Sequence, residues 1–339
     1  MIEAISKKSF EMASINRART PVRNRGHPFA MFLIRHTDVT DPAVNLALEE
    51  YCLRNLDSGF DYLLFYVNRS SIIIGRHQNP FQEFNQKLAR QKDILPVRRI
   101  SGGGAVYHDP GNLNFSFITD FTEEKLDYFK TLIKPILNTL QRLGVPAQLA
   151  EKNNIQVDGK KVSGTSQHTN MRRMLSHGTL LFDTELDVLQ RVLDSNLVIT
   201  KSRAVSSIKS KVTNISWHLH RPMGMDAFRT ELVGGISEVF GELIEYRLTA
   251  EDWEAVDLLA QKKYIPWDWT YGRSPEFVVR HKVSLDAGDV DVHLVVKDGV
   301  IKAIALADQS EISSSALDTI RESIGRRYGA KVAGKIRGK

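Results

Sequence analysis

The spacing of apolar and polar residues predicts interleaved helices and strands from about Phe32 onward. Asp41 is placed to cap a helix with Pro42 in its first turn, and apolar residues then recur every fourth position until Gly59. Amphipathic spacing predicts further helices over 123–143, 185–193, 225–241 and 250–262. Short apolar runs predict strands over 62–67, 72–74, 114–118, 155–157, 160–162 and 179–182, with a short one inside 94–106. This order lacks a regular strand–helix rhythm, so we expect an α/β (α+β) fold with a mixed sheet.

The two ends of the chain differ from the middle. Residues 1–29 are basic and show no apolar period, which predicts a disordered tail; a mitochondrial transit peptide is the alternative. Residues 266–276 form an aromatic, turn-rich connector. Beyond it, alternating strands and a helix near 314–328 predict a small β-rich domain. We therefore divide the chain into a tail (1–29), a main domain (30–265), the connector and a small domain (277–339).

Composition narrows the class of protein. The chain has 339 residues, of which 42% are hydrophobic and 25% charged, as in an ordinary soluble globular protein. Lys+Arg exceed Asp+Glu by 46 − 40 = 6, a mild excess that fits an acidic small molecule or an acidic protein partner as well as nucleic acid. The longest obvious apolar run, Tyr62–Val67, is far shorter than the roughly 20 residues a bilayer requires. With one cysteine, Cys52, the chain has no internal disulfide and points to a reducing compartment.

The strongest chemical signal is the segment from Arg98 to Asn112, RRISGGGAVYHDPGN. Three consecutive glycines are costly in chain entropy, and they occur where the backbone must approach a ligand closely. Their bare N–H groups can form a concavity that binds an anion, and the arginines before them add bidentate donors. The segment matches neither a dinucleotide-binding GxGxxG nor a Walker A loop. It predicts a site for a carboxylate and a phosphate.

Three further segments are weaker signals alone. Lys160 and Lys161 follow the Asp158-Gly159 turn, and strand alternation allows only one of these lysines to point into a given pocket. The residues themselves do not choose between the two. Gly75–Pro80 follows a strand, and Lys201–Asn214 is a basic loop that could cover a phosphate.

Taken together and in this order, these segments resemble the lipoate–protein ligase A family and its related lipoyltransferases. The resemblance runs from about Phe32 to Phe277. Within this range, the segments 161–164 and 177–180 match motifs of the family as well. It implies the mixed α/β catalytic domain shared with biotin ligases and class II synthetases, here 30–265, followed by a small C-terminal accessory domain.

The resemblance also implies a two-step reaction. Lipoate and ATP, with Mg²⁺, give lipoyl-adenylate and pyrophosphate. The lipoyl group then passes to a lysine of an acceptor domain, as in 2-oxoacid dehydrogenase E2 subunits or the glycine-cleavage H protein. Two anions must meet in the first step, so positioning and charge neutralisation dominate. Octanoate is a second candidate substrate, and we expect no nucleic-acid or membrane partner and a cytoplasmic location.

Matching the motifs of the family residue by residue implies the site. Lys161 corresponds to the essential lysine, which reaches both the lipoyl carbonyl and the α-phosphate. The residues implied for lipoate are Arg98, Gly103, Gly104, Lys161 and His177. The residues implied for the nucleotide are Arg99, Gly104, Ala105, Val106, Tyr107, Lys161, Gly164 and Thr179.

One position departs from the family pattern. Asn154 stands where an aspartate usually helps to hold Mg²⁺, and Mg²⁺ prefers anionic oxygen ligands. The substitution predicts weaker metal affinity at this position. It also supports an alternative function, that of a lipoyltransferase that uses preformed lipoyl-adenylate and activates lipoate poorly.

Three other functions fit the sequence less well. An octanoyltransferase would need Cys52 as a nucleophile, but this residue lies on the apolar face of its predicted helix, whereas a reactive thiol needs a polar or cationic setting. A biotin–protein ligase has a differently patterned glycine- and arginine-rich loop. A non-catalytic lipoate-binding subunit would bind lipoate without activating it.

Overall fold

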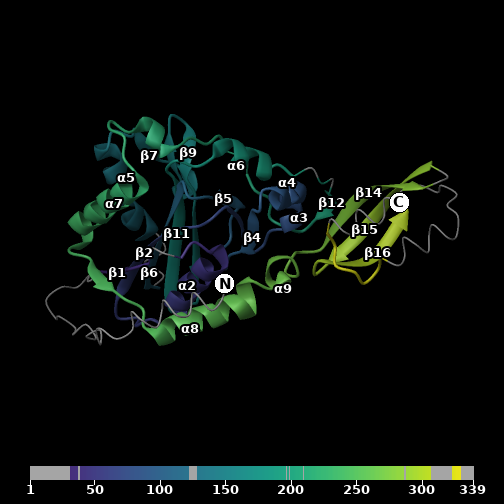
Figure 1. Ribbon diagram of the computed structural model, residues 1–339, viewed down its shortest axis with the longest axis horizontal. Coiled ribbons are helices and arrows are strands. Elements are labelled where there is room, and N and C mark those ends of the chain that lie inside the picture. The colour runs from purple at the N-terminus through teal and green to yellow at the C-terminus, as the bar shows by residue number, and fades with distance from the viewer. Residues whose placement is uncertain are drawn as a thin grey trace. The chain divides into compact units, whose positions relative to one another are not determined.

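The computed structural model describes residues 31–36, 39–121, 128–195, 197, 199–208, 210–285, 288–306 and 323–329. These residues form two compact units that alternate along the sequence (Figure 1). Unit 1 contains the described residues of Met1–Val67, Gly111–Asp183 and Lys211–Gln261. Unit 2 contains those of Asn68–Pro110, Thr184–Ser210 and Lys262–Lys339.

Unit 1 is built on a six-stranded mixed sheet with the order β10-β11-β6-β2-β1-β13. Strand β1 is parallel to both of its neighbours, and the other pairs are antiparallel. The strands are β1 (Met31–Ile34), β2 (Asp61–Val67), β6 (Asn112–Asp120), β10 (Thr165–Thr169), β11 (Arg173–Leu181) and β13 (Ile244–Tyr246). A separate sheet joins β7 (Ala147–Leu149), β8 (Ile155–Val157) and β9 (Lys160–Ser163). The mixed sheet confirms the fold class predicted from the sequence.

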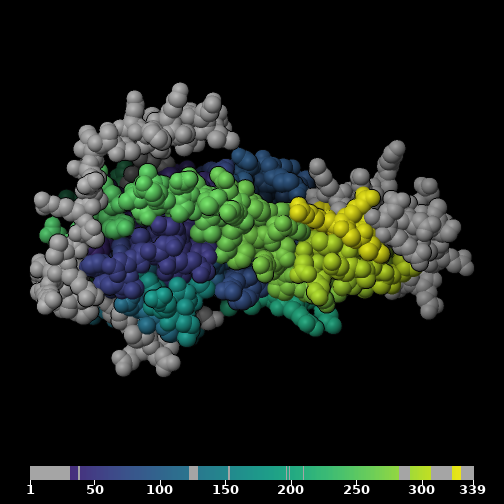
Figure 2. All heavy atoms as spheres, turned by 90° about the horizontal axis from the view of Figure 1, so that it is seen from below, coloured from purple at the N-terminus to yellow at the C-terminus, as the bar shows by residue number. Residues whose placement is uncertain are grey.

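Helices cover both faces of this sheet (Figure 1). On one face, α5 (Tyr128–Arg142) and α7 (Met225–Phe240) enclose the main core, which includes Phe115 and Phe117 of β6. On the other face lie α2 (Pro42–Asn55) and α8 (Ala250–Leu259). Figure 2 shows these two helices side by side, α2 in purple-blue and α8 in green. Short 3₁₀ turns, η2 (Glu151–Asn153) and η3 (Ile215–His218), complete the unit.

The local chemistry of the chain accounts for α2 and the lysine hairpin. The Asp41 carboxylate accepts hydrogen bonds from the backbone N–H groups of Ala43 (2.9 Å) and Val44 (3.3 Å), which caps the helix as predicted. Between β8 and β9, Asp158 and Gly159 both have positive φ, 49° and 71°, the backbone that a tight hairpin turn requires.

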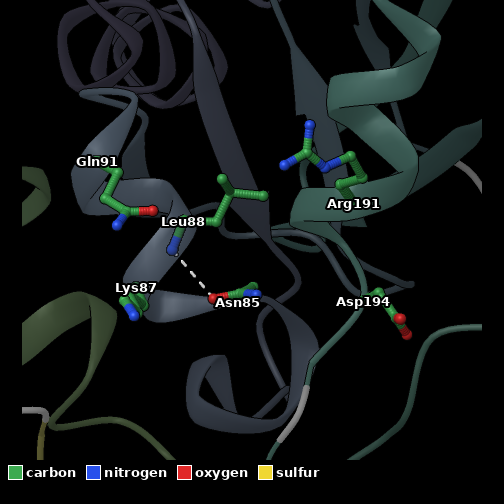
Figure 3. A pocket seen from close by; sticks show the side chains of 6 residues that line it. All are labelled: Asn85, Lys87, Leu88, Gln91, Arg191 and Asp194. Atoms are coloured by element: carbon green, nitrogen blue, oxygen red, sulfur yellow. Dashed lines mark hydrogen bonds between the residues drawn. The ribbon is translucent and has the colours of Figure 1, made fainter.

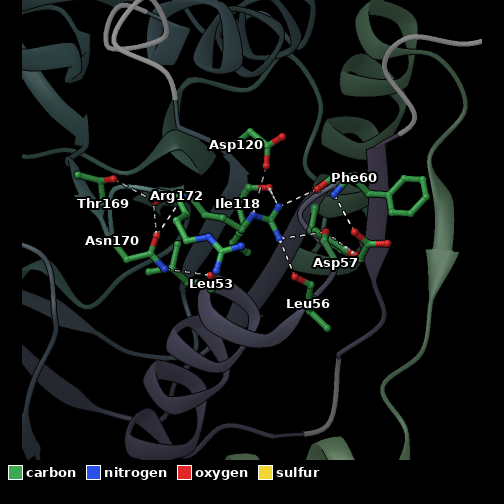
Figure 4. A network of polar contacts seen from close by, with 12 residues as sticks. Leu53, Leu56, Asp57, Phe60, Ile118, Asp120, Thr169, Asn170 and Arg172 are labelled. Atoms are coloured by element: carbon green, nitrogen blue, oxygen red, sulfur yellow. Dashed lines mark hydrogen bonds and ion pairs between the residues drawn. The ribbon is translucent and has the colours of Figure 1, made fainter.

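Arg173, the first residue of β11, is a buried arginine that bonds several backbone carbonyls. The guanidinium of Arg173 donates to the backbone carbonyls of Phe60 (2.7 Å) and Ile118 (3.2 Å), two residues that Figure 4 labels. Arg173 is only 3% exposed. It also bonds the carbonyls of Leu56 and Asp57. Burial lowers the pKa of Arg173, and the nearby Asp120 carboxylate opposes this. Arg173 therefore ties β11 to the chain that joins α2 to β2.

Unit 2 contains two further sheets. The first has the order β4-β3-β5 and the second the order β12-β14-β15-β16. Its strands are β3 (Ser71–Ile74), β4 (Leu95–Arg98), β5 (Val106–His108), β12 (Ile199–Ser202), β14 (Phe277–Leu285), β15 (Gly288–Lys297) and β16 (Val300–Leu306). Its helices are α3 (Pro80–Glu83), α4 (Gln86–Gln91), α6 (Leu186–Val192) and α9 (Trp267–Thr270). A π-helical turn, η4 (Ala260–Tyr264), follows α8.

The predicted elements agree with the structure except at a few places. The runs at 62–67, 72–74, 155–157 and 160–162 are strands, and β11 extends well before the predicted 179–182. Strands β1, β5, β7, β10, β12 and β13 and the short helices α3, α4 and α9 were not predicted. The tail 1–29 and residues 314–322 of the helix expected near 314–328 lie outside the described residues, and residues 323–328 contain a turn and no helix. The boundaries at 265 and 277 stay predictions. No helix among the described residues has the length and apolarity that a membrane span requires.

Candidate active site

The glycine loop between β4 and β5 packs tightly against the end of β3. A Cβ atom on Gly75 would lie 2.1 Å from the carbonyl oxygen of Gly103, so residue 75 must be glycine for the two backbones to approach. Gly103 itself has a φ of 85°, which also favours glycine. The sequence therefore uses glycine on both sides of this contact.

Arg99 fixes the shape of the loop from inside. Its guanidinium donates to the carbonyls of Gly102 and Gly104 (2.5 and 2.9 Å) and, from β3, to that of Ile73 (3.0 Å). Its Nε donates to the hydroxyl of Ser101 (2.9 Å), and the residue is 6% exposed. Drawing the carbonyls toward one cation holds the loop in one shape. Contact of Arg99 with the nucleotide stays a prediction.

Arg98 is directed at backbone carbonyls as well. Its side chain is fully buried, and burial, with a smaller contribution from the Arg99 charge, lowers the pKa of Arg98 to about 10. The guanidinium donates to carbonyls of Gly75, Arg76, Gln78, Trp269 and Thr270. Arg98 thus joins the strand-end motif, Gly75–Pro80 after β3, to α9. The contact of Arg98 with lipoate stays a prediction. To bind lipoate, the guanidinium would have to give up some of its bonds to these carbonyls.

The residues after the loop form β5. Val106 and Tyr107 pair with Ile73 and Ile72 of β3, and Tyr107 is buried. Burial raises the pKa of the Tyr107 hydroxyl. The backbone N–H of Ala105 donates to the hydroxyl of Ser207 (2.9 Å). The stretch implied for the nucleotide is therefore rigidly built into unit 2.

Lys161 lies on β9, and its backbone is paired with the end of the basic segment. Its N–H donates to the carbonyl of Lys211 (2.8 Å), and its carbonyl accepts from Thr213 N–H (3.2 Å). A Cβ atom on Gly164 would lie 2.8 Å from Lys161 Nζ. The ammonium therefore folds back over Gly164, whose N–H donates to the Thr179 hydroxyl (3.2 Å). The structure brings Lys161, Gly164 and Thr179 together, as the resemblance implies.

The variant Gly164→Ala tests this placement. The added methyl group would meet the flexible end of Lys161, so we expect the ammonium to move while the fold is kept. A displacement on the order of 1 Å reduces positioning catalysis by about 100-fold. We expect this loss in the rate of acyl-adenylate formation, measured by mass spectrometry of the product, with an unchanged Tm.

Gly234→Ala is the matched control, because that helical glycine is exposed and has open space around its Cβ position. An equal loss of rate in both glycine variants would contradict the proposed placement of Lys161.

His177 is oriented by a buried carboxylate that the sequence did not reveal. His177 on β11 lies directly opposite Ser116 on β6, so both side chains point to the face covered by α2. There, Glu49 of α2 accepts hydrogen bonds from His177 Nδ1 (3.0 Å to each oxygen), from the Tyr66 hydroxyl (3.0 Å) and from the Ser116 hydroxyl. Burial acts to raise the pKa of Glu49, but His177 and the hydrogen bonds lower it overall.

The variant Glu49→Gln removes this charge at nearly constant volume. Because the folded-state pKa of Glu49 is lowered, its stabilisation is present above the unfolded carboxyl pKa and is lost as the pH falls through the folded value. We expect the variant to unfold at lower urea concentration at neutral pH, with the gap to the unmodified chain narrowing at about pH 3. Equal gaps at both pH values would contradict an ionised Glu49. Tyr66→Phe, which removes one hydrogen bond from Glu49 and leaves His177 in place, is the control.

Asn154 is placed after η2, and its amide is used locally. Its Nδ2 donates to the Glu151 carbonyl (3.0 Å), and its carbonyl accepts from Ala150 N–H (2.8 Å). Among the described residues, no group of three or more His, Cys, Asp or Glu side chains could hold a metal ion. The part of the chain that is described therefore does not fit an all-protein metal site. Asn154 could add one neutral oxygen to a Mg²⁺ ion held chiefly by phosphate oxygens.

The predicted residues fall into two groups. Lys161, Gly164, His177 and Thr179 lie in unit 1 with Asn154, whereas the residues from Arg98 to Tyr107 lie in unit 2. Cys52 is fully buried, and burial raises the pKa of its thiol, which argues against a thiolate nucleophile.

A pocket of unit 2 lies away from the predicted residues. It opens between α4 and α6 and is lined by Asn85, Lys87, Leu88, Gln91, Arg191 and Asp194 (Figure 3). All of its charged side chains are exposed, and none of the predicted site residues lines it. We assign it no role.

Comparison with known proteins places the chain in a family. Residues 41–237 match the lipoyl protein ligase A/B catalytic domain. The chain belongs to this family. The lipoate-protein ligase LplJ of Bacillus subtilis is 44% identical over 274 residues, which cover 80% of this chain and 83% of the relative.

Two solved structures of lipoate–protein ligases are similar to the chain. One is the putative lipoate protein ligase Ta0514 of T. acidophilum with bound lipoic acid (27% identity, TM-score 0.63, covering 72% of this chain and 100% of that one). The other is a lipoate-protein ligase A bound with ATP (26% identity, TM-score 0.63, the same coverage). The resemblance drawn from the motifs, and the fold it implied, are confirmed by these matches to the lipoyl ligase family.

Proposed function

We propose that this chain is an ATP-dependent lipoate–protein ligase. The observation that carries the proposal is the family match, because the matched residues 41–237 contain every predicted site residue from Arg98 to Thr179. Relatives over most of the chain are lipoate–protein ligases, and similar structures hold lipoic acid or ATP. Lipoate and ATP are therefore the substrates.

In the first step, a lipoate carboxylate oxygen attacks the α-phosphorus of ATP, and the bond to the pyrophosphate oxygen breaks. The Lys161 ammonium is a compact charge suited to a carboxylate and a phosphate at once. Its placement over Gly164 supports a role in drawing the two anions together. The glycine loop is proposed to bind the nucleotide, with its carbonyls already turned toward Arg99.

In the second step, the uncharged ε-amine of an acceptor lysine attacks the lipoyl carbonyl. The bond from the carbonyl carbon to the phosphate oxygen breaks, AMP leaves, and the amine proton passes to solvent. We propose lipoyl domains of 2-oxoacid dehydrogenase E2 subunits and the glycine-cleavage H protein as acceptors. The net charge of +6 supports electrostatic steering of an acidic acceptor.

One experiment tests the function. The purified chain is incubated with lipoate, ATP and an apo acceptor domain, and lipoyl-AMP and lipoyl-lysine are measured separately. Formation of both products is expected. Tight lipoate binding without either product would favour a non-catalytic subunit instead.

Asn154 supports a second candidate, a lipoyltransferase that activates lipoate weakly. A neutral oxygen is a poorer Mg²⁺ ligand than a carboxylate, and no acidic cluster is present among the described residues to replace it. We propose that the reaction uses Mg²⁺. We also propose that the protein is located in the cytoplasm, or in mitochondria if residues 1–29 are a transit peptide.

A further inference from the structure

We propose that Glu83 and Ser207 form a latch that positions the nucleotide-binding loop; this rests on the proposed ligase function. The segment 203–208 and the glycine loop are far apart in sequence, but both are described parts of unit 2. The latch comprises Glu83, Ser207 and the groups that they bind. Ser207 lies within the basic loop Lys201–Asn214 that the sequence singled out, whereas Glu83 did not stand out.

The segment is docked along the strand-end motif and α3. The N–H of Val205 donates to the carbonyl of His77 (3.2 Å). The hydroxyl of Ser206 accepts from the Gln82 amide (3.1 Å) at the exposed surface. The N–H of Ser207 donates to Glu83 Oε2 (3.1 Å). Three successive residues of the segment are therefore hydrogen-bonded in turn to His77, Gln82 and Glu83.

The Ser207 hydroxyl uses its full hydrogen-bonding capacity in this contact. It donates to Glu83 Oε2, and it accepts from the Gln78 amide (3.0 Å) and from the backbone N–H of Ala105 (2.9 Å). A hydroxyl has one donor and two acceptor sites, so all three are occupied. Because Ala105 belongs to the predicted nucleotide stretch, its bond to Ser207 fixes the course of the backbone in that stretch.

Glu83 is the anchor of this arrangement. The residue is 5% exposed, and one of its carboxylate oxygens accepts from both the N–H and the hydroxyl of Ser207. Hydrogen bonds to a charged group are about twice as strong as neutral ones, so the carboxylate outweighs the other contacts of the segment. Burial raises the pKa of Glu83, and the bonds from Ser207 oppose that rise.

The glycine loop is shaped to admit Ser207. A Cβ atom on Gly104 would lie 3.1 Å from Ser207 Oγ, which is tighter than ordinary contact. Arg99 holds the carbonyls of the same loop from the other side. The loop is thus held through its carbonyls by Arg99 and through one N–H by Ser207. Glu83 is a positioning residue that acts on the nucleotide only through Ser207 and this loop.

Limited proteolysis tests the latch without relying on activity. Lys201 and Arg203 are exposed tryptic sites next to the docked residues. In Glu83→Ala and Ser207→Ala, we expect trypsin to cut the folded protein within 201–211 about tenfold faster, since losing hydrogen bonds to a charged group weakens docking by at least that factor. Glu83→Gln, which keeps an acceptor oxygen but loses the charge, should restore only part of the protection. Gln82→Ala is the control and should be cut like the unmodified chain.

Steady-state kinetics supply the second readout. We expect Glu83→Ala and Ser207→Ala to raise the KM for ATP about tenfold, with kcat within about twofold and the KM for lipoate unchanged. If Glu83→Ala does not fold, Ser207→Ala alone decides the question. Cleavage rates in the folded Ser207→Ala variant equal to those of the unmodified chain would overturn the latch. Faster cleavage in a chain that makes no lipoyl-AMP would keep the latch and refute the ligase function.

Discussion

Lys161→Ala is expected to abolish formation of lipoyl-AMP while the chain stays folded. The reaction joins two anions, and removing one preorganised positive charge from such a site reduces the rate by about a thousandfold. Lys161 is half-buried on β9 and is not one of the fully buried core residues, so the Tm should change little. Single-turnover formation of lipoyl-AMP, followed by mass spectrometry, measures the loss.

Lys160→Ala is the matched control for this variant. It removes the same charge one residue earlier, from an exposed position on the same strand. We expect its rate to stay within about threefold of the unmodified chain, because an exposed charge contributes little. Similar rates for the two lysine variants would show that net charge, and not the placement of Lys161, governs activation.

Arg98→Met is expected to destabilise unit 2 severely. The variant removes the guanidinium from the carbonyls that now accept from it, including those of Arg76, Gln78 and Thr270. Each buried acceptor left unsatisfied costs about 1–3 kcal/mol, so the free energy of unfolding should fall by about 4 kcal/mol. Denaturation with urea, followed by tryptophan fluorescence, measures this loss, because Trp269 donates to the Arg98 carbonyl (2.7 Å).

Two further variants separate structure from ligand binding at this position. Arg98→Lys keeps the charge but not the planar fork, so we expect it to recover only part of the stability. Arg76→Ala removes an exposed arginine of the same motif and should leave unfolding unchanged. If Arg98→Met unfolds normally but no longer binds lipoate, the arginine serves the ligand and not the fold.

Much of the fold could be predicted from the sequence because its signals are local. The Asp41 cap and the Asp158-Gly159 turn depend on neighbouring residues alone, and both are present as predicted. Strand β10 could not be predicted in this way. Its sequence, TSQHT, has no apolar alternation, and it is a strand because it pairs along β11.

For the candidate site, too, the sequence predicted what depends on neighbouring residues and missed what depends on distant partners. Glycine spacing and the lysine hairpin pointed to the right segments, because these motifs are contiguous in the chain. The roles of Glu49 and Glu83 depend on partners 128 and 124 residues away, His177 and Ser207, which spacing cannot reveal. The acidic pair Glu49 and Glu50, which follows Leu48 inside a largely apolar helix, was the available signal.

The most direct test of the ligase function is lipoate-dependent exchange of labelled pyrophosphate into ATP by the full chain. Exchange requires reversible formation of lipoyl-AMP and needs no acceptor protein, so it isolates activation from transfer. We predict exchange that depends on lipoate at several Mg²⁺ concentrations and needs more Mg²⁺ than a family member with aspartate in place of Asn154. Absence of exchange at every Mg²⁺ concentration, in a chain that still transfers the lipoyl group from added lipoyl-AMP, would contradict the ligase function and identify a lipoyltransferase.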